Sequence, residues 1–307
     1  MSDIKLFRIS NGQAQELQGA STAIEKTLQV LIEQHLEALL GVRFLATEYY
    51  TGKAHGGRID TLGIDENGSP VIIEYKRALN ENVINQGLFY LDWLMDHQAE
   101  FKLLVLEKFG KADADAIAWD MPRLLCIAGD FTRYDEHAVQ QINRNIELIR
   151  YRRYGDELLL LELVNALAEQ ATSAASRAEN GGKTKGKTGY KTVSEYLEQA
   201  PADLRDLFEA IKAFLLALGD DVQMKALKDY FAFTRIKNFA CVEVHPQAKR
   251  MLVYIKVDPT SITLEPGFTR DVRNIGHFGT GDLEISIRNN DDLERAKSLL
   301  LKSYEVS

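Results

Sequence analysis

The chain has 307 residues, of which 45% are hydrophobic and 27% are charged, and its formal net charge is −8 at pH 7. This length allows two domains, and no apolar run approaches the roughly 18 residues that a membrane helix needs. The negative charge argues against a surface coated with phosphate-binding basic residues, so contacts to phosphate alone would give only modest affinity for nucleic acid.

The two cysteines, Cys126 and Cys241, are far apart in sequence, as expected of buried, reduced thiols. No ligand pairs at zinc-site spacing accompany them. The first residues do not have the basic-then-apolar pattern of a secretory signal. We therefore expect a cytoplasmic protein.

The first 170 residues alternate between helical and strand-like patterns. Apolar residues recur at helical spacing over residues 22–40 and stop at Gly41, and Asn80 can cap a second helix that runs through Trp93. A further short helix is expected near residues 137–143. The strand-like runs are 43–50, 58–65, 70–75, 124–128, 146–151 and 158–163. This order predicts an α/β sandwich, with residues 66–69 as a hairpin turn.

Residues 171–192 are small, polar and basic and have the composition of a solvated linker, although their lysines could also touch nucleic acid. The linker separates a domain at residues 1–170 from one at 193–307. In the second domain, Thr192 to Glu195 forms a capping box. The predicted elements that follow are helices at 204–218 and 292–304 and strands at 240–244, 251–257 and 283–287. They predict a smaller, separate α+β domain.

The sequence that points to chemistry is Gly57-Arg58-Ile59-Asp60, followed by Ile73-Glu74-Tyr75-Lys76. Alternate residues of a strand share a face, so Glu74 and Lys76 project together. Asp60 lies on the partner strand of the same hairpin. Two adjacent carboxylates are the hard oxygen ligands that Mg²⁺ or Mn²⁺ prefers, and a lysine beside them can position an attacking water.

The face on which Asp60 lies depends on the turn. A two-residue turn at Asn67-Gly68 would pair Asp60 with Tyr75, on the face opposite to Glu74. A three-residue loop with Gly68 left-handed, or a bulge near Pro70, would instead bring Asp60 opposite Lys76. The metal-site hypothesis therefore requires the odd loop or the bulge.

These motifs, together with Gln86-Gly87-Leu88-Phe89-Tyr90, resemble the PD-(D/E)XK nuclease superfamily and its NucS-like endonuclease branch over residues 22–93. The one departure is Ile59 where the superfamily name has proline. The resemblance implies a restriction-endonuclease-like α/β domain, a mixed sheet flanked by helices, that cleaves DNA with Mg²⁺ or Mn²⁺. RNA is not excluded as a substrate, and a homodimer would suit cleavage of both strands.

The resemblance also implies roles for individual residues. Asp60 and Glu74 would be metal ligands and Lys76 the catalytic lysine. Gln86 and Tyr90, one helical turn apart, would line the site. Arg58 and Arg77 are candidates for nucleic-acid contact, and pairing with a nearby acid is the equal alternative for Arg58.

An upstream acid on the first helix would complete the metal shell, with Glu25 favoured over Glu33. Glu25 also fits the last position of a capping box that begins at Thr22, and Glu33 also fits an ordinary solvated helix residue. Two alternatives to a nuclease remain open. One is a catalytically silent nucleic-acid-binding module, and the other is an interaction protein that acts through its C-terminal domain.

Three other features have competing interpretations. Arg150, Arg152 and Arg153, with Tyr151 and Tyr154, fit either a basic–aromatic edge for nucleic acid or a solvated strand edge. Trp93 and Phe89 are expected in the core. The glycine-rich residues 274–282, which include His277, fit an anion cradle but are better explained as a loop between strands. The C-terminal half resembles a domain of unknown function found at the C-terminus of uncharacterised bacterial proteins.

Overall fold

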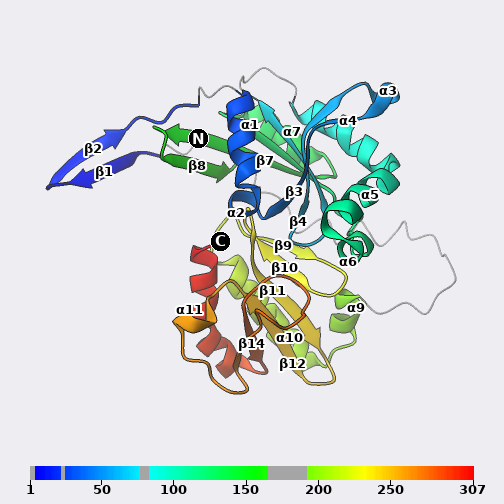
Figure 1. The fold of residues 1–307 in the computed structure, drawn as a ribbon. Coiled ribbons are helices and arrows are strands. Elements are labelled where there is room, and N and C mark those ends of the chain that lie inside the picture. The colour runs from blue at the N-terminus through cyan, green and yellow to red at the C-terminus, as the bar shows by residue number, and fades with distance from the viewer. Residues whose placement is uncertain (1–3, 22–24, 77–82, 165–191) are drawn as a thin grey trace. The chain divides into compact units, whose positions relative to one another are not determined.

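The computed structural model describes residues 4–21, 25–76, 83–164 and 192–307 (Figure 1). The chain divides into two compact units, Met1–Asn165 and Ala166–Ser307. Most of the expected linker, including its glycine- and lysine-rich part, lies outside the described residues.

The first unit is built on a six-stranded mixed sheet in the order β3-β4-β5-β6-β7-β8. Its strands are β3 Val42–Tyr50, β4 Arg58–Asp65, β5 Pro70–Lys76, β6 Arg123–Ala128, β7 Asn145–Tyr154 and β8 Leu158–Leu163. The pairs β5/β6 and β6/β7 are parallel and the other neighbours are antiparallel. All six predicted strands are therefore confirmed, and the central ones are buried because their side chains are nearly all apolar.

Helices flank this sheet. They are α1 Glu25–Gln34, α2 Leu36–Leu40, α3 Gly52–His55, α4 Val83–Asp96, α5 Gln98–Phe109, α6 Lys111–Asp115 and α7 Arg133–Gln141. The predicted first helix is thus broken at His35, and it stops at Gly41 as expected, because Gly41 adopts the left-handed conformation of a helix C-cap. Trp93 and Leu94 of α4 and Phe101 of α5 share a core with Leu62 and Leu124 of the sheet. Helices α5 and α6 were not predicted from the sequence.

A two-stranded hairpin, β1 Leu6–Ser10 and β2 Gln13–Leu17, also went unpredicted. It projects from the first unit (Figure 1). Its turn at Asn11-Gly12 has positive φ at both residues, which matches the twist of a hairpin. Phe7 and Ile9 leave the same face of the hairpin and are exposed.

Two expectations about this unit are wrong. Phe89 is 46% exposed instead of buried, whereas Trp93 is in the core as predicted. Arg150 does not lie on a basic–aromatic edge or a solvated edge, because its guanidinium is buried and paired with Asp130 and Glu162. Tyr151 is buried too, with its hydroxyl donating to the Ser21 carbonyl.

The second unit contains a six-stranded sheet, entirely antiparallel, in the order β13-β14-β12-β11-β10-β9. The strands are β9 Gln223–Ala226, β10 Phe231–Thr234, β11 Asn238–His245, β12 Arg250–Ile255, β13 Thr269–Asp271 and β14 Leu283–Ile287. The helices are α9 Val193–Glu198, α10 Ala202–Leu216 and α11 Asn290–Glu305, with a 3₁₀ turn at Pro259–Ser261. The predicted strands and helices are confirmed, and the capping box of Thr192 and Glu195 forms both of its bonds.

The helices of the second unit share one hydrophobic core with one face of its sheet. A smaller cluster on the other face includes Cys241, Tyr254 and Val272. Cys126 and Cys241 are both buried free thiols, as expected. No helix of the described residues is long and apolar enough to span a membrane.

Candidate metal-binding site in the first unit

The turn between β4 and β5 sets the register on which the candidate site depends. Gly68 is left-handed, with φ +76°, and its N–H donates to the Asp65 carbonyl. The N–H of Asp65 in turn donates to the carbonyl of Ser69, which leaves a three-residue loop. This is the odd loop that the metal-site hypothesis required.

The resulting register differs from the predicted one by two residues. Thr61 pairs with Ile73 and Leu62 with Ile72, so the next position along β4, Asp60, falls opposite Glu74 instead of Lys76. A shift of two residues preserves the face on which a side chain lies. Asp60 therefore still shares a face with Glu74. Had the two acids been on opposite faces, they could not have formed the site.

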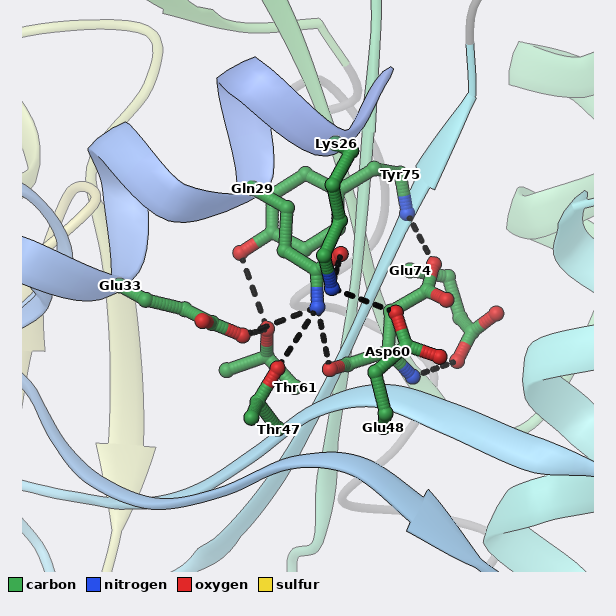
Figure 2. A network of polar contacts seen from close by, with 9 residues as sticks. All are labelled: Lys26, Gln29, Glu33, Thr47, Glu48, Asp60, Thr61, Glu74 and Tyr75. Carbon is green, nitrogen blue, oxygen red and sulfur yellow. Dashed lines mark hydrogen bonds and ion pairs between the residues drawn. The ribbon is translucent and has the colours of Figure 1, made fainter.

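The ladder between β4 and β5 ends at Thr61 and Ile73. Beyond that pair, the two carboxylates replace backbone acceptors. Asp60 Oδ2 accepts the N–H of Tyr75 at 3.0 Å, and Glu74 Oε1 accepts the N–H of Asp60 at 3.2 Å. The strands thus separate where the two acids sit, and each acid is fixed by the other's strand (Figure 2).

Glu74 is fully buried and pairs across the parallel ladder with Cys126, whereas Asp60 is half-buried. Burial, with Glu74 as the next contributor, raises the pKa of the Cys126 thiol, so this side chain stays protonated at neutral pH. Lys76 is the last residue of β5 and is half-buried. By strand alternation it leaves β5 on the face of Glu74.

A polar network from α1 contacts the backbone of Asp60 (Figure 2). The Gln29 amide is buried and donates to the Asp60 carbonyl at 2.7 Å, to Thr47 Oγ1 at 3.1 Å and to Glu33 Oε1 at 3.0 Å. Because one side chain bonds a helix and two strands, α1 is held at a fixed place over β3 and β4.

Glu33 belongs to this network and is not an ordinary solvated residue. Its Oε1 also accepts from Thr61 Oγ1 at 2.6 Å, and Thr61 lies 3.2 Å from the Tyr75 hydroxyl. Burial raises the pKa of Tyr75, and Glu33, Asp60 and Glu74 contribute in the same direction. Tyr75 therefore remains a neutral phenol. Its side chain lies on the face of the sheet opposite to Asp60 and Glu74. Glu25 is the first residue of α1, and its side chain lies outside the described part of the chain.

Glu48 is a nearby acid that the sequence does not predict. The pairs Thr47/Thr61 and Tyr49/Ile59 flank Glu48 and place it opposite Asp60 on β3. Glu48 has a left-handed backbone, φ +50°, which is uncommon outside glycine, asparagine and aspartate. Its carboxylate is bonded to Lys26 at 2.7 Å. Nothing in the local sequence signals this conformation.

Gln86 and Tyr90 lie at the start of β4, a part of the strand that is close to Asp60 in sequence. Gln86 Nε2 donates to the Tyr90 hydroxyl at 3.2 Å, and the same hydroxyl accepts the N–H of Arg58 at 3.1 Å. A Cβ at Gly57 would lie 2.6 Å from the Tyr90 ring, so glycine is needed for this contact. The structure thus brings Gln86 and Tyr90 to the strand that carries Asp60. Arg58 is exposed there, and Arg77 falls outside the described residues.

The donor set fits a hard divalent cation. Asp60 and Glu74 offer two adjacent carboxylates, and Mg²⁺ characteristically takes one or two carboxylates and completes its shell with water and phosphate oxygens. Among the described residues, no group of three histidine, cysteine, aspartate or glutamate side chains is arranged to hold a metal. Among these residues, Asp60 and Glu74 are therefore the pair that could hold a metal, and the side chain of Glu25, the predicted upstream acid, lies outside them.

Comparisons with known proteins add the following. A family model described as a domain of unknown function (DUF5655) matches residues 193–307. An uncharacterized protein of Haemophilus influenzae is 27% identical over 312 residues, which covers 98% of this chain and all of that protein. A chain of the solved EndoMS–dsDNA complex matches with a TM-score of 0.25 and 20% identity, and the match spans 43% of this chain and 47% of that one.

Together, fold and site define a mixed α/β unit whose six-stranded sheet is flanked by helices and carries a pair of facing acids, followed by an all-antiparallel sheet unit covered by helices. The second unit corresponds to the DUF5655 match.

Proposed function

We propose that the first unit is a divalent-metal-dependent endonuclease of the PD-(D/E)XK type that hydrolyses phosphodiester bonds in DNA. The observation that carries this proposal is the β4/β5 register, which places Asp60 opposite Glu74 where the two strands separate. DNA as the substrate comes from the resemblance of the motifs, and so does the NucS-like type.

In this proposal Asp60 and Glu74 hold Mg²⁺ or Mn²⁺, which supplies Lewis-acid stabilisation of the phosphate and lowers the pKa of bound water. The residues are already oriented, because the backbone N–H groups of Tyr75 and Asp60 fix one oxygen of each carboxylate. A site that is rigid before the reaction does not spend free energy on reorganisation during it.

Lys76 has a different task. Its ammonium, on the same face as Glu74, positions the attacking water and offsets the charge that develops on the phosphate. Gln86 and Tyr90 shape the edge of the site through their bond to the start of β4. Arg58, exposed beside them, contacts the DNA backbone, and Arg77 is a second candidate for this contact.

The test is a cleavage assay with the full chain on single-stranded, duplex, forked and RNA substrates in Mn²⁺ or Mg²⁺. We expect cleavage of at least one DNA substrate, abolished by EDTA. Lys76→Ala should reduce the rate by roughly 10²-fold or more, as removal of one charge-stabilising group does in other enzymes. Lys102→Ala is the matched control, because Lys102 is an exposed lysine paired with Asp115 on α5 and α6.

Two results would contradict the proposal. One is the absence of cleavage on every substrate with either metal. The other is cleavage that Lys76→Ala and Lys102→Ala leave equally unchanged, which would identify a contaminating nuclease. Binding of DNA without cleavage, unaffected by Lys76→Ala, would instead support the silent binding module.

A further inference from the structure

The second unit has a pocket on the side of its sheet away from the helices. Its volume is about 490 Å³, within the range of small-molecule sites. The lining residues are Lys256, Asp258, Val272, Arg273, Ile275, His277, Gly279, Thr280, Gly281 and Asp282. Most of them belong to the glycine-rich stretch between β13 and β14.

Two of the glycines are explained by packing. A Cβ on Gly279 would lie 2.6 Å from the Cβ of Cys241, and one on Gly281 would lie 2.5 Å from the backbone nitrogen of Ile255. Both glycines also have φ values, +81° and +155°, that other residues rarely adopt. They let the segment lie directly on β11 and β12, which agrees with the interpretation as a loop between strands.

The backbone N–H groups of residues 277–281 form a row of hydrogen-bond donors along this segment. The N–H of Phe278 donates to Glu243 Oε1 and that of Thr280 contacts Cys241 Sγ. Within the described residues, the N–H groups that alternate with these two, those of His277, Gly279 and Gly281, have no acceptor, and these three residues line the pocket. Several backbone N–H groups around one concavity form an anion-binding arrangement.

His277 adds a hydrogen-bond acceptor, its ring nitrogen Nε2. Its ring stacks on Tyr254 at 4.4 Å, and Nδ1 lies 2.9 Å from the Ile275 carbonyl. A carbonyl only accepts, so Nδ1 carries the proton and a neutral ring keeps a lone pair at Nε2. Nε2 is buried, and no hydrogen-bond partner for it exists among the described residues.

Arg273 and Lys256 supply positive charge at this pocket, and Asp258 and Asp282 of the same lining supply negative charge. The Arg273 guanidinium is held by Asp271 at 2.6 Å and lies 3.5 Å from Asp258. It is partly exposed, and Asp271 contacts its Nε and Nη2 while Asp258 contacts its Nη1, so two of the five N–H donors of the guanidinium remain. It is therefore oriented and still able to bond an incoming oxyanion.

We infer that this pocket binds a small molecule that carries a phosphate group. The group's oxygens would accept from the N–H row and from Arg273. A phosphate or phosphate monoester that retains one proton can also donate to Nε2 of His277, which sulfate at neutral pH cannot do. The pocket is larger than a phosphate ion. We therefore expect the ligand to be a phosphate monoester.

Isothermal titration calorimetry with the full chain tests this inference with inorganic phosphate, sulfate, adenosine monophosphate and adenosine as probes. We expect phosphate to bind more tightly than sulfate, adenosine monophosphate to bind more tightly than phosphate, and adenosine not to bind. Arg273→Ala should weaken binding about tenfold, equivalent to roughly 1.4 kcal/mol. Arg270→Ala, three residues earlier on β13 and outside the pocket lining, should change it less than twofold.

His277→Phe keeps a ring to stack on Tyr254 and removes both ring nitrogens, so it should abolish the preference for phosphate over sulfate. The inference is overturned if the wild-type chain binds neither phosphate nor adenosine monophosphate. It is also overturned if Arg273→Ala and Arg270→Ala weaken binding equally, because binding would then follow general surface charge. This site is independent of the nuclease proposal, and its test requires no cleavage.

Discussion

Gln29 connects α1 to the two strands β3 and β4. One buried amide bonds Glu33 on its own helix, Thr47 on β3 and the backbone of Asp60 on β4. Replacement by leucine removes the Gln29 donor from the Asp60 carbonyl and from Thr47 Oγ1, while Glu33 Oε1 keeps the Thr61 hydroxyl as a donor. An unmet buried polar group costs about 1–3 kcal/mol.

We therefore expect Gln29→Leu to lower the free energy of unfolding of the first unit by about 2 kcal/mol in urea denaturation. Gln34→Leu, at an exposed position of the same helix, is the control and should change it by less than about 0.5 kcal/mol. Equal effects would show that the Gln29 network does not stabilise the fold.

At the scale of elements, the β4/β5 turn fixes the face on which Asp60 lies. Gly68 is left-handed, and a Cβ there would meet the Ala116 carbonyl at 3.0 Å. Gly68→Ala should lower the free energy of unfolding by about 1–2 kcal/mol, because alanine disfavours this conformation. Gly68→Asn introduces the same Cβ but tolerates the left-handed region better, so it should be the more stable of the two in thermal denaturation. The opposite order would mean that the Cβ contact dominates.

Arg123 joins three strands of the same sheet. It lies on β6 and bonds Asp65 of β4 at 3.0 Å and Glu147 of β7 at 2.8–2.9 Å, with all three side chains buried. Burial alone would lower the pKa of Arg123, but Glu147 and Asp65 outweigh it and raise the pKa, so the guanidinium stays charged. The Asp65 carboxylate also accepts the N–H groups of Asn67 and Ser69 in the turn.

Arg123→Met should therefore leave two buried carboxylates without their cation, at a cost of about 3–5 kcal/mol in the free energy of unfolding. Arg153→Met removes an arginine whose partner, Asp156, is fully exposed, and should cost less than about 1 kcal/mol. Chemical denaturation followed by circular dichroism measures both. A small effect at Arg123 would indicate that water enters the site and solvates the acids.

The sequence predicted elements well where one strong local pattern dominated. The apolar runs of β5 and β6, the hairpin turn within residues 66–69 and the Thr192 capping box are such cases. It predicted poorly where long-range packing decides the outcome. Phe89 is exposed although its neighbours are core, and α5 has apolar residues on several sides, which conceals its helical period.

The candidate site shows the same division. The motif indicated Asp60, Glu74 and Lys76 as candidate residues. The turn residues left the face of Asp60 open, and only the metal-site hypothesis required the loop that places Asp60 on the face of Glu74. The exact partner of Asp60 was wrong by two residues, because the loop fixes the parity of the register more firmly than its value. Glu48 could not have been found, since its place depends on pairing with β4 and on an unusual backbone conformation.

At the scale of the whole molecule, each unit has its own hydrophobic core. We expect residues 1–165 and 193–307, expressed separately, to fold with cooperative thermal transitions and with the secondary structure each has in the full chain, as domains with independent cores do. Circular dichroism and calorimetry of both fragments measure this. A fragment that fails to show a cooperative transition would mean that its fold depends on the rest of the chain.

The acids at the end of the β4/β5 ladder have an evolutionary consequence. Asp60 and Glu74 accept backbone N–H groups that would otherwise lose their partners where the strands separate. If the proposed nuclease activity were lost in a descendant, selection for folding alone would therefore still retain both acids. Among relatives of this protein, the presence of acids at positions 60 and 74 is for this reason not by itself evidence of the proposed activity.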